Sequence, residues 1–238
     1  MPEERRFGAF GHNRGVCGRA QYLKVPEIIE AYGPARVGDV DEAAPADEAF
    51  PNSVVPGLVL SNGERVVSSF AWAFFADGTG HNARLETAPD RPAWRDAFAS
   101  ARLILPLARF VEGRAWFADS GGGPLAVAGL YRLDGPGAGR SHPARPPGPG
   151  LPGVRRDAAA AGPPAAPARR ATMLTRPADG AVAPFHERMP VILPADLIGP
   201  WLAGEAVPAA RLLHESPALR VEPLTRPGPP PPDQLTLL

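Results

Sequence analysis

The pattern of apolar and polar positions predicts a chain made mainly of β-strands. The clearest signal is the stretch from Leu58 to Phe70, in which apolar residues flank the dipeptide Asn62-Gly63. Asn-Gly favours the tight turn that joins two antiparallel strands, so this stretch is predicted to be a β-hairpin. Further strands are predicted over Leu103–Leu107, Ala115–Ala118, Leu125–Leu133, Ala171–Thr175 and Pro190–Leu193.

Three short helices are predicted between and after these strands. The first runs from Lys24 to Ala31 and ends at Gly33. Asp90 is a suitable N-cap for a second helix over Pro92 to Phe98, because proline is tolerated in a first helical turn. A third helix is predicted over Pro194 to Leu202. No internal repeat is visible, and 238 residues fit one ordinary domain.

Three segments have a composition that cannot form a core. Residues 134–170 are almost wholly Pro, Gly, Ala and Arg, so we expect a disordered insertion between two strands, unless a frame error produced them. Residues 1–15 show no periodicity and are expected to be disordered or to precede the true start. Residues 227–238 contain a proline run and are expected to be an extended tail. The predicted domain spans residues 16–226, interrupted by 134–170.

Composition and charge restrict the function classes. Lys plus Arg equals Asp plus Glu at 25 each, so the formal net charge is zero. This balance argues against a protein that holds long duplex DNA by phosphate neutralisation alone, but it leaves room for a local basic groove. No apolar run approaches the ~20 residues of a membrane span, and the N-terminus is not a signal peptide. We therefore expect a soluble, cytoplasmic protein that has no membrane partner.

Four short stretches contain the residues that could carry chemistry. They are Cys17-Gly18-Arg19, the run from Asn82 to Thr87, Phe110-Val111-Glu112-Gly113 and the run from His186 to Leu193. Each stretch taken alone can be explained without a function. A lone cysteine is usually a small buried hydrophobe, and a lone His or Glu is usually hydrogen-bonded near the surface. Cys17 is the only cysteine, so no internal disulfide is available. The histidines show no metal-ligand spacing and no phosphate loop is present, so no metal or cofactor is expected.

Taken together, the order and spacing of the four stretches resemble the SOS response-associated peptidase (SRAP) family. The resemblance is carried by Cys-Gly-Arg near the start, Asn-Ala-Arg-x-Glu-Thr, an aromatic-x-Glu after an Ile-Leu-Pro strand, and His-Glu-Arg-Met-Pro-Val-Ile-Leu near the end. It covers about residues 16–133 and 171–203. It implies an α+β fold, a mixed domain built on antiparallel β-sheets with short flanking helices and a shallow groove for single-stranded DNA.

The resemblance also implies roles for individual residues. Cys17 would be the nucleophile, Asn82 and Glu112 its active-site partners, and His186 the acid/base. The residues that would contact DNA are Arg19, Arg84 and Trp72. The implied function is to sense abasic sites in single-stranded DNA by forming a covalent thiazolidine crosslink through an N-terminal cysteine. It would combine lyase activity on abasic DNA with peptidase-type processing of its own N-terminus, and we expect a monomer.

The chemistry of these residue types agrees with those roles. An open abasic sugar is an aldehyde, which an amine and a thiol on adjacent carbons trap as a five-membered ring. The α-amine of an N-terminal residue has a pKa near ~7.7–8, so a useful fraction is neutral at physiological pH. A His and a Glu can supply the proton transfers, which typically contribute ~10²–10⁴-fold, while an Asn orients the amine and arginines neutralise phosphates.

The position of Cys17 bears directly on this chemistry. In the family the cysteine follows the initiator methionine, whereas here Val16 precedes it. A GTG valine codon is also a bacterial start codon, so we expect the working protein to begin there and to expose Cys17 once methionine is removed. A nitrogen held in an amide cannot close a thiazolidine. Two alternatives remain: a cysteine hydrolase using Cys17 and His186, or a degenerate family member that only binds single-stranded DNA or a protein partner.

Overall fold

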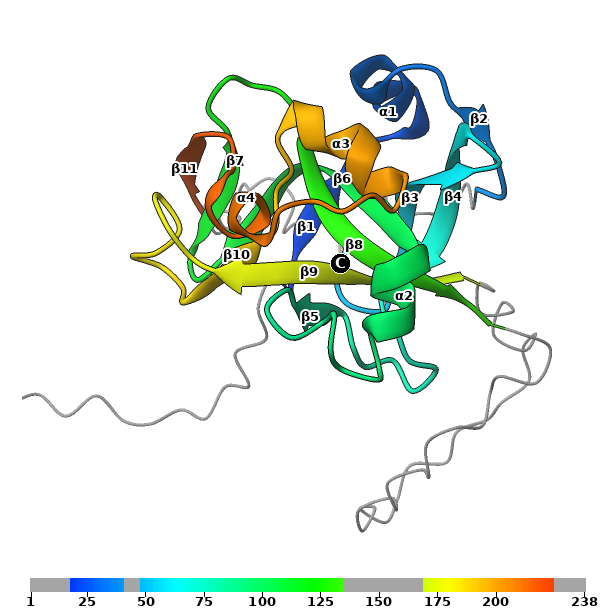
Figure 1. Cartoon of the computed structure of the whole chain (residues 1–238). Helices are drawn as coiled ribbons and strands as arrows, with labels where there is room; N and C mark the ends of the chain where they lie inside the picture. Colours follow the sequence, from blue (N-terminus) through cyan, green and yellow to red (C-terminus); the bar gives the residue numbers. More distant parts are fainter. Residues whose placement is uncertain (1–17, 41–47, 135–168, 225–238) are drawn as a thin grey trace, which may run out of the picture.

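A computed structural model of the chain describes residues 18–40, 48–134 and 169–224, which form eleven strands and four short helices (Figure 1). The strands are β1 (Ala20–Tyr22), β2 (Arg36–Val37), β3 (Val54–Ser61), β4 (Glu64–Ala71), β5 (Asn82–Arg84), β6 (Arg102–Glu112), β7 (Ala115–Asp119), β8 (Leu125–Leu133), β9 (Arg169–Pro177), β10 (Arg188–Pro190) and β11 (Leu219–Pro223). The helices are α1 (Val25–Tyr32), α2 (Arg95–Ser100), α3 (Ala195–Leu202) and α4 (Ala209–His214). The fold is therefore α+β, as predicted.

The strands form one mixed sheet that curls on itself. Its main order is β10-β9-β4-β3-β6-β7-β11, with β1 added to β6, β2 to β4 and β5 to β9. Most neighbours are antiparallel, whereas β2–β4, β4–β9 and β5–β9 are parallel. Strand β8 pairs with both β6 and β9, so the pairings β6–β3–β4–β9–β8–β6 make a closed circuit. The sheet thus has an inner and an outer face.

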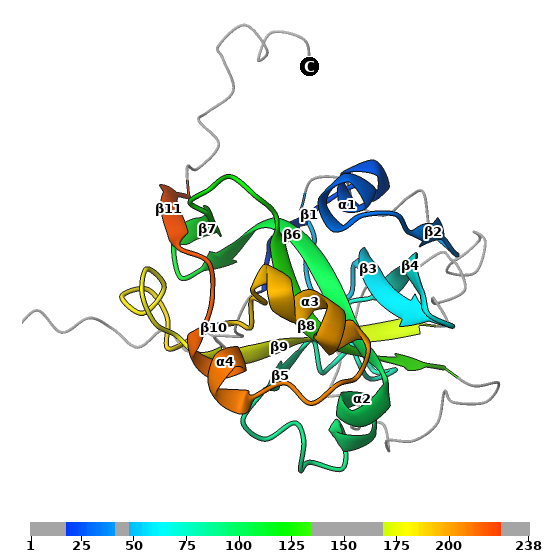
Figure 2. The ribbon, with the colours of Figure 1, turned by 45° about the horizontal axis from the view of Figure 1, so that its top comes forward.

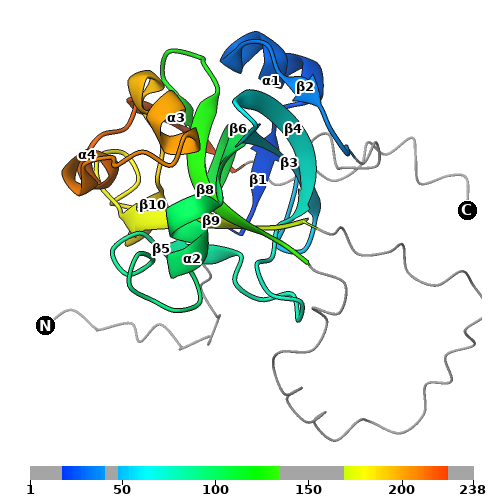
Figure 3. The same ribbon diagram turned by 45° about the vertical axis from the view of Figure 1, so that its right-hand side comes forward.

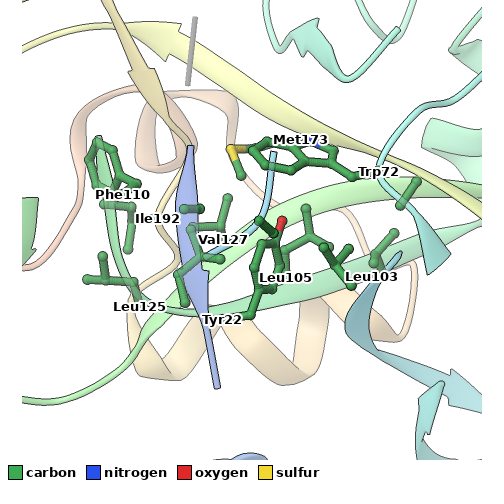
Figure 4. Packing of buried hydrophobic residues seen from close by; sticks show 14 of the residues in the cluster. Tyr22, Trp72, Leu103, Leu105, Phe110, Leu125, Val127, Met173 and Ile192 are labelled. Atoms are coloured by element: carbon green, nitrogen blue, oxygen red, sulfur yellow. The ribbon is translucent and has the colours of Figure 1, made fainter. Parts of the chain in front are cut away.

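Alternate residues of β6 face two hydrophobic clusters, one on each side of the sheet. Leu103 and Leu105 lie in the inner cluster together with Trp72 (Figure 4). Ile104 lies in the outer cluster with Trp201 of α3, whose indole N–H donates to the carbonyl of Leu103 at 3.0 Å. Helices α3 and α4 lie over this outer face (Figure 2), and α2 packs against β8 (Figure 3). Burial on both faces makes the middle of β6 and β8 almost wholly apolar.

The hairpin predicted from the Asn-Gly dipeptide is confirmed. Strands β3 and β4 pair antiparallel from Val54 opposite Ala71 to Ser61 opposite Glu64, and Asn62-Gly63 forms the turn between them. Both turn residues have positive φ angles, 51° and 79°, which Asn and Gly adopt more readily than other residues. The strands predicted in the middle of the chain lie within β6, β7 and β8.

The predicted insertion is shorter than its composition indicated. The sequence pattern places it over 134–170, but Arg169 and Arg170 already belong to β9. Arg170 donates to the carboxylate of Asp134 at 2.7 Å, so the two residues that bound the segment contact each other. Residues 135–168 lie outside the described residues, as do the predicted extension at 1–15 and the predicted tail at 227–238.

Two further element boundaries differ from the prediction. The second helix begins at Arg95 rather than at Pro92, because the preceding residues form hydrogen-bonded turns, one of which joins the Trp94 N–H to the Arg91 carbonyl at 2.9 Å. The last predicted strand is displaced toward the N-terminus and spans Arg188–Pro190. None of the described helices is both long and apolar enough to cross a membrane.

Candidate active site

Two residues singled out in the sequence lie together, Glu112 at the end of β6 and His186 in the segment before β10. Nδ1 of His186 is 3.6 Å from Oε2 of Glu112. Only 3% of the Glu112 side chain and 13% of the His186 side chain are exposed. The separation is longer than a hydrogen bond and suits an ion pair once the imidazole is protonated. The two side chains thus form a largely buried carboxylate–imidazole pair, an arrangement that is common where enzymes transfer protons.

Glu112 is positioned by the tight turn from β6 into β7. It is the last residue of β6 and pairs with Ala115 across the turn. Gly113 has a φ of 58°, which a glycine adopts without a steric penalty. A Cβ atom at Gly113 would lie 2.9 Å from the carbonyl oxygen of Phe185, so glycine also allows the turn to approach the segment that carries His186. This close approach sets the distance between the carboxylate and the imidazole.

A row of aromatic rings supports the segment before His186. The Phe185 ring meets Phe117 edge-on at 5.4 Å, and Phe117 stacks on Phe110 at 5.4 Å. Phe110 and Phe117 are fully buried, whereas Phe185 is 42% exposed. The buried rings anchor the backbone of the neighbouring histidine, and Phe185 adds an apolar surface beside the acid–base pair.

The backbone of Arg188 contacts one ring nitrogen of His186 with both a donor and an acceptor. Nδ1 of His186 lies 3.0 Å from both the amide nitrogen and the carbonyl oxygen of Arg188. When Nδ1 accepts the amide N–H, the neutral imidazole carries its proton on Nε2. When Nδ1 is protonated, it can donate to the carbonyl oxygen or face the Glu112 carboxylate. The same ring atom can thus change from acceptor to donor without a change of rotamer.

The Arg188 side chain links the His186 stretch to the Asn82 stretch. Its guanidinium, 8% exposed, makes a bidentate ion pair with Glu86, in which Nη2 and Oε2 are 2.9 Å apart. It also donates to the carbonyl oxygen of Thr175 in β9 at 2.7 Å. The hydrogen bond from Arg188 lowers the pKa of the Glu86 carboxyl. We call this set of contacts the Arg188 clamp.

Asn82 is fixed at the edge of the inner cluster. It is the first residue of β5 and lies opposite Met173 in the parallel pairing with β9. The carbonyl of His81 accepts hydrogen bonds from the Trp72 indole and from the Met173 amide, each at 3.0 Å. Burial lowers the pKa of the His81 imidazole. Strand β9 and the Arg188 clamp connect Asn82 to the segment that carries His186.

The first described residues of the chain run beside Glu112. Strand β1 pairs with β6, and the amide N–H of Val111 donates to the carbonyl of Arg19 at 2.9 Å, next to Glu112. Gly18 is the first residue that the structure describes. Cys17 lies outside the described residues, and one peptide bond joins it to Gly18.

The three predicted DNA contacts differ in exposure. Arg84 is exposed at the end of β5. Arg19 is partly exposed, pairs with Glu48 at 2.6 Å and lies with its guanidinium 5.1 Å from the Trp116 ring centre. Trp72 is 0% exposed, fills the inner cluster and holds the loop before β5 through its indole N–H. The structure corrects the predicted DNA contact of Trp72, because a fully buried indole offers no face to a base.

Comparison with known proteins identifies the family. A family model described as SOS response associated peptidase (SRAP) matches residues 16–226. The chain belongs to the SRAP family. Membership supports an SOS-associated, peptidase-like role for this SRAP protein. Among curated proteins, none matches the sequence.

Three solved structures share the SRAP fold of this chain. A Bordetella bronchiseptica protein is 23% identical over 88% of this chain and 100% of its own, with a TM-score of 0.64. A Bacteroides thetaiotaomicron protein is 17% identical over 86% and 90%, with a TM-score of 0.61. A phage-related protein from Bordetella bronchiseptica is 22% identical over 88% and 95%, with a TM-score of 0.58. At these identities the structures support the fold alone.

The supporting residues of the site have no clear signal in the sequence of the SRAP chain. Phe185 lies outside the four stretches that resemble the family, and only its position directly before His186 indicates that it belongs to the site. Glu86 and Arg188 lie inside two motifs, but nothing in their local sequence indicates that they pair with each other. Among the described residues, no group of three His, Cys, Asp or Glu side chains is arranged to hold a metal ion.

Proposed function

We propose that this SRAP protein forms a covalent crosslink to abasic sites in single-stranded DNA through the amine and thiol of Cys17. The observation that carries the proposal is the buried Glu112–His186 pair, 3.6 Å apart, beside the chain segment that leads to Cys17. Capture of an aldehyde by an amine and a thiol requires several proton transfers at one carbon atom. An acid–base pair near Gly18, the residue that follows the only cysteine of the chain, could supply them.

The reaction joins one aldehyde, one amine and one thiol and releases one water. The α-amine of Cys17 attacks C1′ of the ring-opened sugar, and a proton moves from nitrogen to the former carbonyl oxygen. His186 protonates the resulting hydroxyl, so that water leaves as an iminium forms, and the iminium nitrogen returns its proton to His186 to give the neutral imine. The Cys17 thiol then loses its proton to the acid–base pair, and its sulfur adds to the imine carbon. The nitrogen takes up a proton, and the thiazolidine ring is complete.

Glu112 and His186 have different parts in this sequence. The protonated imidazole presents its Nε2–H as the acid while its Nδ1–H faces the Glu112 carboxylate. When the imidazole gains a second proton, the Glu112 carboxylate 3.6 Å away stabilises the charge. The low exposure of both side chains strengthens this interaction, because little water screens it.

The surroundings of the pair suit a single strand rather than a duplex. Phe185 is an exposed aromatic ring on which an unpaired base can stack. Arg84 and Arg114 are exposed on the neighbouring β5 and on the β6–β7 turn, where they can neutralise phosphates. In a duplex the bases are already stacked on one another, so the aromatic surface would remain unused.

The proposal requires a free α-amine at Cys17 and is tested with two proteins. One is initiated at Met1, and the other is initiated at residue 16 through Val16→Met. Each is incubated with a single-stranded oligonucleotide that carries one abasic site, and adducts that survive heating in detergent are counted over time. We expect adducts from the shorter protein alone, and none after Cys17→Ser in that protein. Equal crosslinking rates for the full-length protein, shown intact by mass spectrometry, would contradict the mechanism.

A further inference from the structure

A cavity lies at the opposite end of the molecule from the Glu112–His186 pair. It measures about 570 Å³ and lies between β2, β3 and β4 on one side and the ends of β8 and β9 on the other. In Figures 1 and 2 these elements are on the right, whereas β7 and β10 are on the left. A volume of roughly 300–1,000 Å³ is typical of sites for small organic ligands.

The rim of this cavity carries an excess of positive charge. Arg36 and Arg169 line it, and among the described residues of the lining Asp39 alone carries a carboxylate. Arg169 lies 3.3 Å from that carboxylate, whose side chain is 86% exposed. Such an exposed pair contributes little free energy, so a ligand anion can replace Asp39. Within the described parts of the chain, Arg36 makes no ion pair, and its guanidinium is free to bind a phosphate in bidentate fashion.

The same rim exposes apolar side chains. Val37 is 50% exposed and Leu133 is 63% exposed, and both belong to the small set of large apolar residues that the described chain leaves open to solvent. The half-buried Tyr131 lines the same cavity, and its ring contacts Phe70 at a centroid distance of 5.7 Å. A ligand with a flat apolar body would cover these side chains and release the water on them.

The backbone itself keeps the cavity open. Strands β4 and β9 pair only at Ala71 and Arg170 and then diverge, so no ladder fills the space beside them. The chain after β2 approaches β4 so closely that a Cβ at Gly38 would lie 2.7 Å from Oγ of Ser68. The walls are thus set by strand geometry, and binding requires little rearrangement.

We propose that this cavity binds a nucleotide, with the phosphate held by Arg36 and Arg169 and the base placed against Tyr131 and Leu133. The nucleotide can be a free monophosphate or one unit of a single strand, since both present the same phosphate and base. The site uses none of the residues assigned to crosslinking. Its existence is therefore independent of the proposed reaction at Cys17.

Titration calorimetry with thymidine monophosphate tests the site in the full chain and in its Cys17→Ser variant. We expect saturable binding that is equal in both proteins. Arg36→Glu and Arg169→Gln should each weaken it by about tenfold or more, while Arg91→Gln, which changes an exposed arginine elsewhere, should leave it unchanged. Thymidine without the phosphate should bind at least about tenfold more weakly. Equal melting temperatures of the variants confirm that each one is folded.

Further ligands show whether the site takes a free nucleotide or a unit of a strand, and which part of the nucleotide it recognises. If an oligothymidylate displaces the monophosphate, and Arg36→Glu weakens direct binding of the oligothymidylate, the natural ligand is a unit of a strand. If the oligothymidylate does not displace the monophosphate, the site is assigned to free nucleotides. The inference is overturned if thymidine binds as tightly as its monophosphate, if inorganic phosphate alone binds as tightly, or if Arg36→Glu has no effect. Absence of saturable binding at millimolar concentration also overturns it.

Discussion

At the scale of the residue, the burial of Glu112 bears on the acid–base role proposed for Glu112 and His186. A carboxylate that is 3% exposed depends on neighbouring charge and hydrogen bonds to stay ionised, and the imidazole 3.6 Å away can supply positive charge after it takes up a proton. We therefore expect the pair to act as a unit rather than as two independent groups. Loss of either member changes the charge that the other can carry.

Substitution of either residue should slow crosslinking by about 10²–10⁴-fold in the protein that begins at Cys17. Glu112→Gln and His186→Gln preserve size and remove the proton-transfer group. Because the two residues act as a unit, the double variant should be little slower than the slower single one. His214→Gln, at the exposed end of α4, is the matched control and should keep the full rate. Adduct formation on abasic single strands measures all four, and additive losses would show that the residues act separately.

Phe185 should contribute to affinity for intact single-stranded DNA as well as for the abasic site. Base stacking on an aromatic ring is worth about 1–3 kcal/mol, so Phe185→Ala should weaken binding by roughly 5- to 150-fold. Phe185→Trp should retain it. Val221→Ala removes another exposed apolar side chain, on β11, and should have no effect. Fluorescence anisotropy with an undamaged oligonucleotide gives the affinities, and equal values for Phe185→Ala and Val221→Ala would exclude stacking on this ring.

At the scale of the elements, the Arg188 clamp holds β9, β10 and the turn after β5 together. Arg188→Met should destabilise the fold by about 2–3 kcal/mol, because buried hydrogen bonds to a charged group are lost. Arg95→Met removes an ion pair whose side chains are 60% and 85% exposed, and should cost about 0–1 kcal/mol. Urea unfolding at neutral pH measures both. Equal losses would show that the clamp contributes no more than a surface pair.

The clamp also predicts the sign of an acid effect. The pKa of Glu86 is lowered in the folded state, so its stabilising effect is complete above its unfolded value, about 4.3, and is lost as the pH falls through the lower folded value. The stability difference between the natural protein and Arg188→Met should therefore shrink below about pH 4.3. Urea unfolding at a series of pH values tests this, and a difference that stays constant at low pH would contradict it.

The elements differ in how far the sequence predicts them. Local signals were enough to predict the hairpin, because Asn62-Gly63 fixes the turn and thereby the pairing of the two strands that flank it. Strand β5 has only three residues and is held by β9, far away in the chain, so no local pattern reveals it. The same holds for the site: the sequence identifies Glu112 and His186 as candidates, but only the fold places Phe185 beside them and joins Glu86 to Arg188.

At the scale of the whole molecule, the ends of β8 and β9 lie next to each other. Leu133 pairs with Arg169 in an antiparallel register, so their α-carbons are about 5 Å apart, a distance that a two-residue turn can span. Replacing residues 135–168 with a short Gly/Ser linker should leave the melting temperature and crosslinking largely unchanged. Calorimetry and the adduct assay measure the outcome, and loss of soluble protein would show that the segment contributes to the fold.

The closed circuit of strand pairings predicts the order in which the strands come together during folding. Hairpins such as β3–β4 and β6–β7 join strands that are close in sequence and can form early. The circuit closes only when β9 meets both β8 and β4, and its link to β4 is the single pair Ala71–Arg170. Contacts between distant parts of a chain form late because the loop entropy must be overcome first. We therefore expect docking of β9 to be the slow step of folding, and release of β9 to begin unfolding.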